Sequence, residues 1–153
     1  MRPYPVVLST LLCAGVLAVP ASADTVRFKP GEGTSITDGK ITCVMGVSQG
    51  GVGSVRCSGP RVSDEWGAKT DCEIIGNDGT PETVDGMRAI GLRERGRNRK
   101  EAICGVGGAI DAKRGDTIIL GDIRGERLSS GGFRFRNKDG HGFTLTTRAL
   151  KRV

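Results

Sequence analysis

The sequence has few of the residues from which catalytic and metal sites are usually built. It has one histidine, His141, and none of its five cysteines stands in a C-x-x-C pair. A single imidazole without a paired nucleophile or ligand set is a weak catalytic signal. Cysteine pairs at close spacing are typical of structural zinc sites, and they are absent. The composition therefore favours a protein that uses neither a metal nor another cofactor.

Aromatic residues and long apolar segments are also scarce. Aromatic side chains make up 4% of the chain, and no window beyond the N-terminal region repeats apolar residues at helical spacing. The one apolar run covers residues 6–19, whereas a membrane-spanning helix needs roughly 18 or more residues. We therefore expect no transmembrane anchor and no long helix.

The apolar run has the flanks of a secretory signal peptide. Arg2 precedes it, and Ala21, Ser22 and Ala23 supply the small residues of a cleavage site. We predict a cleaved signal peptide over residues 1–23, which removes Cys13, followed by a single domain over residues 24–153. The protein is then expected to be secreted and extracellular, or associated with the cell envelope.

Four cysteines remain after cleavage, and an even number in an exported chain indicates two disulfides. Four cysteines allow three connectivities. We favour Cys43–Cys57 and Cys72–Cys104, because two adjacent strands would each present one cysteine of the first pair inward. The Cys43–Cys57 disulfide would close a short loop and so contribute on the order of 3 kcal/mol to stability. A metal site made of all four cysteines is the rival interpretation, which an oxidising compartment disfavours.

Short alternating runs bounded by glycine, asparagine and aspartate dominate the rest of the chain, as is typical of β-strands. The pattern predicts an all-β fold, a small antiparallel barrel or sandwich tied by two disulfides. The segment 60–69 is polar and is expected to be a loop. The predicted strands are 26–29, 40–46, 52–57, 70–75, 87–92, 101–106, 117–120, 133–136 and 142–147.

Charge is distributed unevenly along the chain. Residues 24–87 carry 6 basic and 10 acidic side chains, whereas residues 88–153 carry 16 basic and 7 acidic ones. The densest basic block is expected at the tip of a hairpin, where guanidinium groups bind phosphate and carboxylate. Its candidate anion-binding residues are Arg93, Arg95, Arg97, Arg99 and Lys100.

The segment Gly46–Gly50 matches G-x-S-x-G, the nucleophile elbow of α/β-hydrolases, with Ser48 at its centre. That elbow requires a helix after the serine, but the glycine-rich residues 50–54 are poor helix formers. A glycine-rich loop between two strands explains the match better. A small secreted hydrolase that uses Ser48 or His141 is therefore the alternative interpretation.

The order and spacing of several short elements resemble a family of small secreted actinobacterial proteins of unknown function. These elements are an I-x-C and a V-R-C string around the first two cysteines, then a tryptophan, two further cysteines, a G-D-T string and the R-N-x-x-G-H-G-F string at 136–143. The resemblance implies export and a disulfide-tied β domain, and it implies no activity. Relatives often carry one more cysteine pair near the last string, where this chain has Phe135.

The leading functional hypothesis is a secreted, non-enzymatic binding domain. Its expected partner is an anionic polymer of the cell envelope or the extracellular space, bound through the arginine-rich segment and the basic C-terminal hairpin. A second expected kind of partner is another secreted protein. Dedicated nucleic-acid binding is not expected, because no aromatic residues alternate with the arginines to stack on bases.

Overall fold

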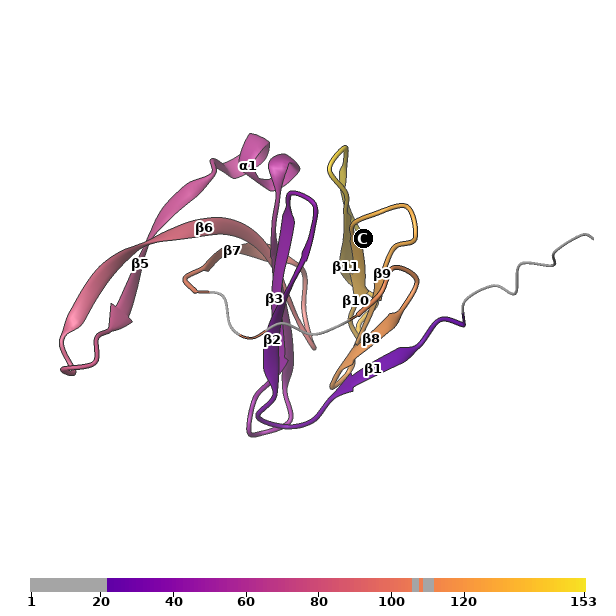
Figure 1. Cartoon of the computed structure of the whole chain (residues 1–153), viewed down its shortest axis with the longest axis horizontal. Coiled ribbons are helices and arrows are strands. Elements are labelled where there is room, and N and C mark those ends of the chain that lie inside the picture. Colours follow the sequence, from indigo (N-terminus) through magenta and orange to yellow (C-terminus); the bar gives the residue numbers. More distant parts are fainter. Residues whose placement is uncertain (1–21, 106–107, 109–111) are drawn as a thin grey trace, which may run out of the picture.

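The computed structural model describes residues 22–105, 108 and 112–153, and most of the predicted signal peptide lies outside these residues. The described chain forms two β-sheets that pack face to face, with one short helix (Figure 1). No helix within those ranges is long and apolar enough to cross a membrane. The predicted all-β class is confirmed.

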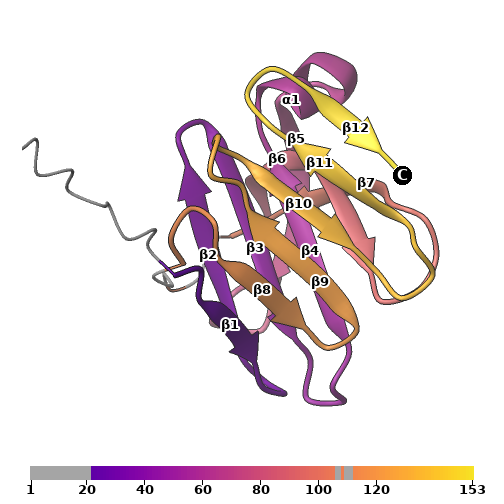
Figure 2. The same ribbon diagram turned by 90° about the vertical axis from the view of Figure 1, so that its right-hand side faces the viewer.

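The first sheet, sheet A, contains six strands and has one broad face turned away from the rest of the molecule (Figure 2). Neighbouring strands are antiparallel, except that the first two are parallel. In spatial order its strands are β1 (Thr25–Phe28), β8 (Thr117–Leu120), β9 (Ile123–Arg127), β10 (Phe133–Arg136), β11 (Gly142–Leu145) and β12 (Leu150–Arg152).

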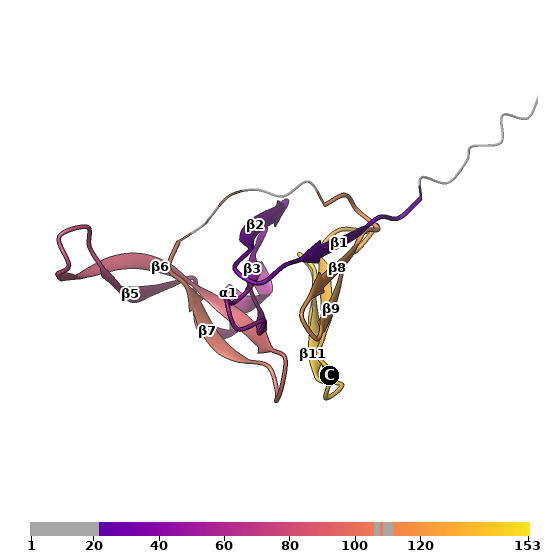
Figure 3. The same cartoon turned by 90° about the horizontal axis from the view of Figure 1, so that it is seen from below.

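The second sheet, sheet B, is antiparallel throughout. Its strands lie in the order β2 (Gly33–Asp38), β3 (Ile41–Val47), β4 (Gly53–Ser58), β6 (Pro81–Arg93) and β5 (Lys69–Ile75), and β7 (Arg99–Ile103) also pairs with β6. The first half of β6 pairs with β5, whereas its second half lies between β4 and β7. The paired residues 69–75 and 81–87, with their turn, therefore form a two-stranded projection, here called the arm (Figures 1 and 3).

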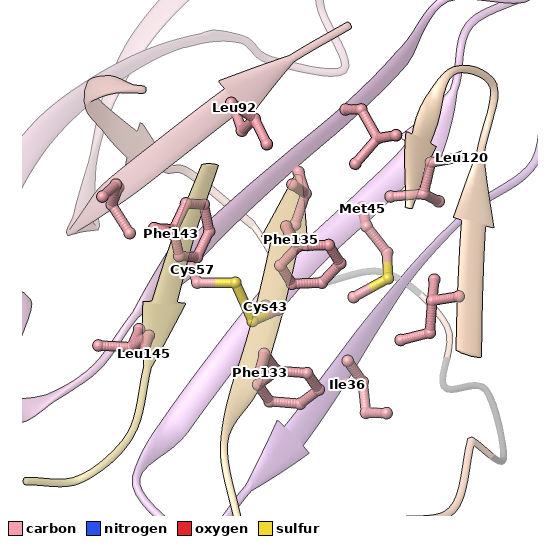
Figure 4. Packing of buried hydrophobic residues seen from close by; sticks show 14 of the residues in the cluster. Ile36, Cys43, Met45, Cys57, Leu92, Leu120, Phe133, Phe135, Phe143 and Leu145 are labelled. Carbon is pink, nitrogen blue, oxygen red and sulfur yellow. A yellow bond between two sulfur atoms is a disulfide. The ribbon is translucent and has the colours of Figure 1, made fainter. Parts of the chain in front are cut away.

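The core lies between the sheets and follows from the alternation of apolar and polar residues along the strands. In β10 the side chains of Phe133 and Phe135 are buried and the arginines between and after them are exposed. Phe143 from β11 completes a group of three rings beside the buried Cys43–Cys57 disulfide (Figure 4). Both predicted disulfides are present, with S–S distances of 2.04 and 2.07 Å.

The prediction of a loop over residues 60–69 was wrong. Residues Pro60–Trp66 form the helix α1, and β5 begins at Lys69. Proline at the first helical position is preorganised for a helix, because its fixed φ suits that position. Only Val62 of α1 is fully buried, so seven residues contain too few apolar positions to show a helical period. A residue far along the chain also packs on the helix, since Arg152 of β12 lies over the Trp66 ring.

Several strands are missing from the sequence-based prediction or are longer than it proposed. The strands β2, β9 and β12 were not predicted, and β6 runs for 13 residues. These segments lack a clean alternation: β9 carries a buried glycine and a half-buried arginine on its inner side. In β6 the first half is largely exposed and the second half is buried, because only the second half lies between other strands. A local pattern cannot show such a change of environment.

A buried carboxylate ties the sheets together at the end of β2. Asp38 is 5% exposed, and its Oδ1 atom accepts a hydrogen bond of 2.7 Å from Arg114. Its Oδ2 atom accepts one of 3.0 Å from the backbone N–H of Gly132 and lies 3.5 Å from the Arg127 Nε atom. Burial alone would raise the pKa of Asp38, but the bonds from Arg114 and Gly132 outweigh it and lower the pKa.

Two further aspartates have lowered pKa values, so we expect the protein to lose stability in acid. The backbone N–H groups of Asp24 and Lys113 lower the pKa of Asp116, and the hydroxyl and N–H of Thr80 lower the pKa of Asp78. A carboxylate with a lowered folded pKa contributes stability that is complete above the ordinary pKa of 3.8. That contribution is lost as the pH falls through the folded pKa. Denaturant unfolding between pH 7 and pH 2.5 should therefore show a free energy of unfolding that declines below about pH 4; a value that stays constant there would contradict the expectation.

Candidate functional site

The arginine-rich segment lies at the tip of the hairpin formed by β6 and β7, as predicted. Arg93 ends β6 and Arg99 begins β7, so residues 94–98 form the tip itself. All five candidate anion-binding side chains are exposed. They do not form one patch, however, because successive residues of a strand point to opposite sides: Arg93 and Arg99 lie on the side of Glu101, whereas Lys100 lies on the other.

Part of the positive charge at this tip is already neutralised by one carboxylate. Glu101 lies on the outer side of β7, where its Oε2 atom accepts a hydrogen bond of 2.6 Å from Arg56 of β4. Its Oε1 atom lies 3.8 Å from the Nε of Arg93 and 3.9 Å from the Nε of Arg99. These two arginines are therefore less available to an external anion than the sequence suggested.

The other three cations of the segment have no such neighbour. Within the described part of the chain, no ion pair involves Arg95, Arg97 or Lys100. Arg97 lines a hollow of about 350 Å³ together with Asn98, His141, Arg152 and Val153. The tip and the start of β7 thus offer three uncompensated positive charges, of which Arg97 lies beside the C-terminal hairpin.

The single acid within the arginine block has a structural role. Glu94 accepts hydrogen bonds at its Oε1 atom from the backbone N–H of Gly53, at 2.7 Å, and of Asp122, at 3.1 Å. Gly53 begins β4 in sheet B, and Asp122 lies in the turn between β8 and β9 in sheet A. Glu94 therefore joins the two sheets at the end opposite to Asp38.

The string at residues 136–143 holds the tip in place. The buried Asn137 side chain donates hydrogen bonds to the carbonyl oxygens of Arg93, at 3.0 Å, and Gly96, at 2.7 Å. Its oxygen accepts one of 3.0 Å from the His141 N–H. Gly140 closes the turn with a φ of 84°, which only glycine adopts readily. These contacts explain the asparagine and the glycine of the string through structure, whereas they give no structural role to the side chains of Arg136 and His141.

A second basic surface lies on the open face of sheet A and was only partly predicted. The exposed arginines of β10 point outward, opposite to its buried phenylalanines, and the cross-strand register aligns them with outward residues of β9, β11 and β1. Lys151 of β12 is in register with Thr144 on the same side. We call this surface the basic face; its cations are Arg27, Arg124, Arg134, Arg136 and Lys151.

The positive charge of the basic face is almost uncompensated. Glu126 is the single acid on its strands, and its Oε2 atom lies 3.8 Å from the Nη1 of Arg134. Asp122, in the turn between β8 and β9, also borders the face, but its Oδ2 atom lies 3.6 Å from the Nζ of Lys138. Among the described residues, no ion pair involves the other four cations. A hollow of about 590 Å³ lies over β9, β10 and β11, with Arg124, Arg134 and Arg136 in its lining. The face therefore combines a concave surface with free guanidinium groups.

The geometry of the sheet spaces these charges regularly. Side chains on neighbouring strands lie about 5 Å apart, and alternate residues of one strand lie about 7 Å apart. A polymer with an anionic group on each repeat could therefore contact several cations at once. None of the aromatic side chains that the structure describes lies on this face: four are buried phenylalanines, and Trp66 belongs to α1.

The sequence predicted the two cations of the basic face that lie on β10, Arg134 and Arg136, but not the other three. The F-R-F-R alternation of residues 133–136 showed that these two arginines face water. Arg124 was missed because the strand β9 was not predicted. Arg27 escaped notice because β1 joins sheet A through a parallel pairing with β8, some 90 residues along the chain.

The two candidate catalytic residues of the alternative hypothesis do not come together. Ser48 lies in the loop between β3 and β4, where its hydroxyl accepts a hydrogen bond of 3.2 Å from the Val52 N–H. It lines a hollow on sheet B, whereas His141 lines the hollow beside Arg97. The next element after Ser48 is the strand β4 and not a helix, so the nucleophile elbow is absent.

Comparisons with known proteins give no identification. No model of a protein family, no curated protein and no solved structure matches the chain. The resemblance to small secreted actinobacterial proteins therefore stays a prediction.

Proposed function

We propose that this protein is a secreted, non-enzymatic binding domain that holds an extended anionic polymer of the cell envelope or the extracellular space. The observation that carries the proposal is the basic face, where the strands of a concave sheet surface present five cations and only one acid, Glu126. The free cations Arg95 and Arg97 of the tip and Lys100 of β7 supply further positive charge, and Asn137 ties the tip to the C-terminal hairpin.

The two disulfides support an extracellular location. Disulfides persist in oxidising compartments and are rare in the cytosol. The apolar N-terminal run with its cleavage pattern gives the chain a route to such a compartment. Secretion from an actinobacterium is part of the same proposal and rests on the sequence strings described above.

The chemistry of the face favours a polymer of phosphate, sulfate or uronate groups over a nucleic acid. Arginine binds such groups bidentately, and several bound at once release counterions. Single-stranded nucleic acids usually also stack their bases on aromatic side chains, which this face does not offer. The ligand is therefore expected to be a polysaccharide or a polyol phosphate.

The proposal predicts a strong loss of affinity when the basic face is neutralised. Exchanging Arg124, Arg134 and Arg136 for glutamine is expected to weaken binding to dextran sulfate or polyphosphate about 30- to 100-fold at low salt. The slope of log K against log salt should become shallower by about 2, since three charges are removed. Fluorescence anisotropy of labelled polymer across a salt series measures both quantities.

A matched control separates the face from the net charge. Exchanging the exposed Lys29, Lys40 and Lys69 for glutamine removes the same charge from elsewhere on the surface. This control variant is expected to retain affinity within about threefold. Equal losses in the two variants would show that only net charge matters, and an unchanged face variant would refute the proposed site. Neutral dextran should not bind either protein.

A further inference from the structure

The arm carries the charge opposite to that of the basic face. Residues 70–86 contain five carboxylates and no basic side chain. Within the described part of the chain, no ion pair involves any of the five. Asp78 nevertheless has a local partner, because its carboxylate accepts hydrogen bonds from Thr80. The other four are Asp71, Glu73, Glu82 and Asp85.

Three of these carboxylates lie together on one face of the arm. Asp71 is directly opposite Asp85, and Glu73 lies two residues further along β5. Like charges directly opposite each other destabilise a strand pair. Towards the tip, the same face ends in Ile75, which is 70% exposed and opposite Pro81. The exposed Lys69 at the base of β5 is the one cation on this face, so the face presents a net negative charge and an uncovered apolar side chain.

The arm also has little support from the rest of the molecule. An isolated two-stranded hairpin is at best marginally stable in water, and β7 pairs with β6 only from Met87 onward. The Cys72–Cys104 disulfide fixes the arm near its base. Beyond it, both edges of the arm expose unpaired backbone groups. A surface that covers the arm would therefore stabilise it.

The arm cannot reach the basic face of its own chain. It projects from sheet B, and sheet A lies on the other side of sheet B with its open face turned away from the arm (Figures 1 and 3). Any contact between these two surfaces must therefore join two molecules.

From this charge complementarity we propose that the acidic face of the arm docks on the basic face of a second copy of this chain. Asp71, Glu73 and Asp85 meet Arg124, Arg134 and Arg136, which have the complementary charge and stand on a surface wide enough for two strands. The contact is head-to-tail, so each copy keeps one free arm and one free basic face, and association yields open chains unless a ring closes. This inference goes beyond the proposed function and does not require that a polymer binds.

A contact of this kind would compete with polymer for the basic face. Self-associated molecules would have their guanidinium groups covered, and an added polyanion would release them. Salt would weaken the association, because both surfaces are exposed to solvent.

Sedimentation velocity over a concentration series at low ionic strength tests the inference. The wild-type protein is expected to sediment faster as its concentration rises, and this increase should be lost in 0.5 M salt. It should also be lost in an arm variant, in which Asp71, Glu73 and Asp85 become Asn, Gln and Asn, and in the face variant described above. A control with Asp24, Glu32 and Asp64 neutralised in the same way should associate like the wild type.

Charge reversal makes the test independent of folding defects. The D71K/E73K/D85K variant and the R124E/R134E/R136E variant should each remain monomeric. Their mixture should associate, because each supplies the surface that the other lacks. A monomeric wild type, or an arm variant that still associates, would overturn the inference.

The two proposals can fail separately. The arm variant should still bind dextran sulfate with at least wild-type affinity. Loss of self-association with polymer binding intact supports the docking inference, whereas self-association without any polymer binding refutes the proposed function alone. If the arm instead binds only a different, basic protein, the wild type stays monomeric and the inference is wrong.

Discussion

Replacing Asp38 with asparagine is expected to destabilise the protein by about 2–3 kcal/mol. The amide has nearly the shape of the carboxylate, so packing is preserved. It offers one oxygen where the structure needs two acceptors, one for Arg114 and one for the Gly132 N–H. The loss also leaves Arg127, which is only 20% exposed, without its opposite charge. Denaturant unfolding at pH 7 measures the effect.

An exposed ion pair provides the control for this prediction. Exchanging Asp64 for asparagine breaks the pair with Arg61 on α1, in which both side chains are largely exposed. Such pairs contribute at most about 0.5 kcal/mol. Because protonation also removes the charge of Asp38, the difference between wild type and the Asp38→Asn variant should shrink below about pH 4. A loss in the free energy of unfolding that is small at pH 7, or that is unchanged in acid, would contradict the role given to Asp38.

The second large effect is expected from replacing Asn137 with alanine. The exchange leaves two carbonyl oxygens of the tip and the His141 N–H without their partner. Each buried polar group that loses its hydrogen bond costs about 1 kcal/mol or more, so a loss of about 2–3 kcal/mol is expected. The tip should also detach locally from the C-terminal hairpin, which hydrogen exchange at residues 94–98 and 137–142 would show as faster exchange.

Aspartate at the same position separates the contacts of Asn137. The Asn137→Asp variant keeps the oxygen that accepts the His141 N–H bond but loses both donors to the tip. Its tip should exchange as fast as that of the alanine variant, whereas the turn at 137–141 should stay protected. If the tip exchanges at the wild-type rate in both variants, then Asn137 is not needed to hold it, and the Glu94 bridge and the bonds from Gly96 to Asp139 and from Asn98 to Gly142 are enough.

Much of the framework was predictable from the sequence, because it depends on local patterns. The alternation of apolar and polar residues over 133–136 and 143–145 predicts strands with phenylalanine and leucine inward. The pairing of Cys43 with Cys57 followed from two neighbouring strands that present cysteine to the same side. Such features depend on residues a few positions apart, and their physical chemistry is the same in any fold.

The candidate site could be predicted only in part. The arginine block was recognised from its composition, but the sequence could not show that Glu101 attracts two of its arginines while three others stay free. Glu101 acts on Arg56 through a pairing of β4 with β6 and of β6 with β7. Charge counts along the chain do not contain this information.

The sequence by itself determined the β class, the two disulfides and the places of the main turns, since each rests on short-range alternation or on the even number of cysteines. The tertiary structure alone decided that Arg27, Arg124, Arg134, Arg136 and Lys151 share one face. It also decided that the acidic arm and this face lie on opposite sides of the molecule. Both depend on which strands become neighbours, and that choice is made by burying one side of each sheet against the other.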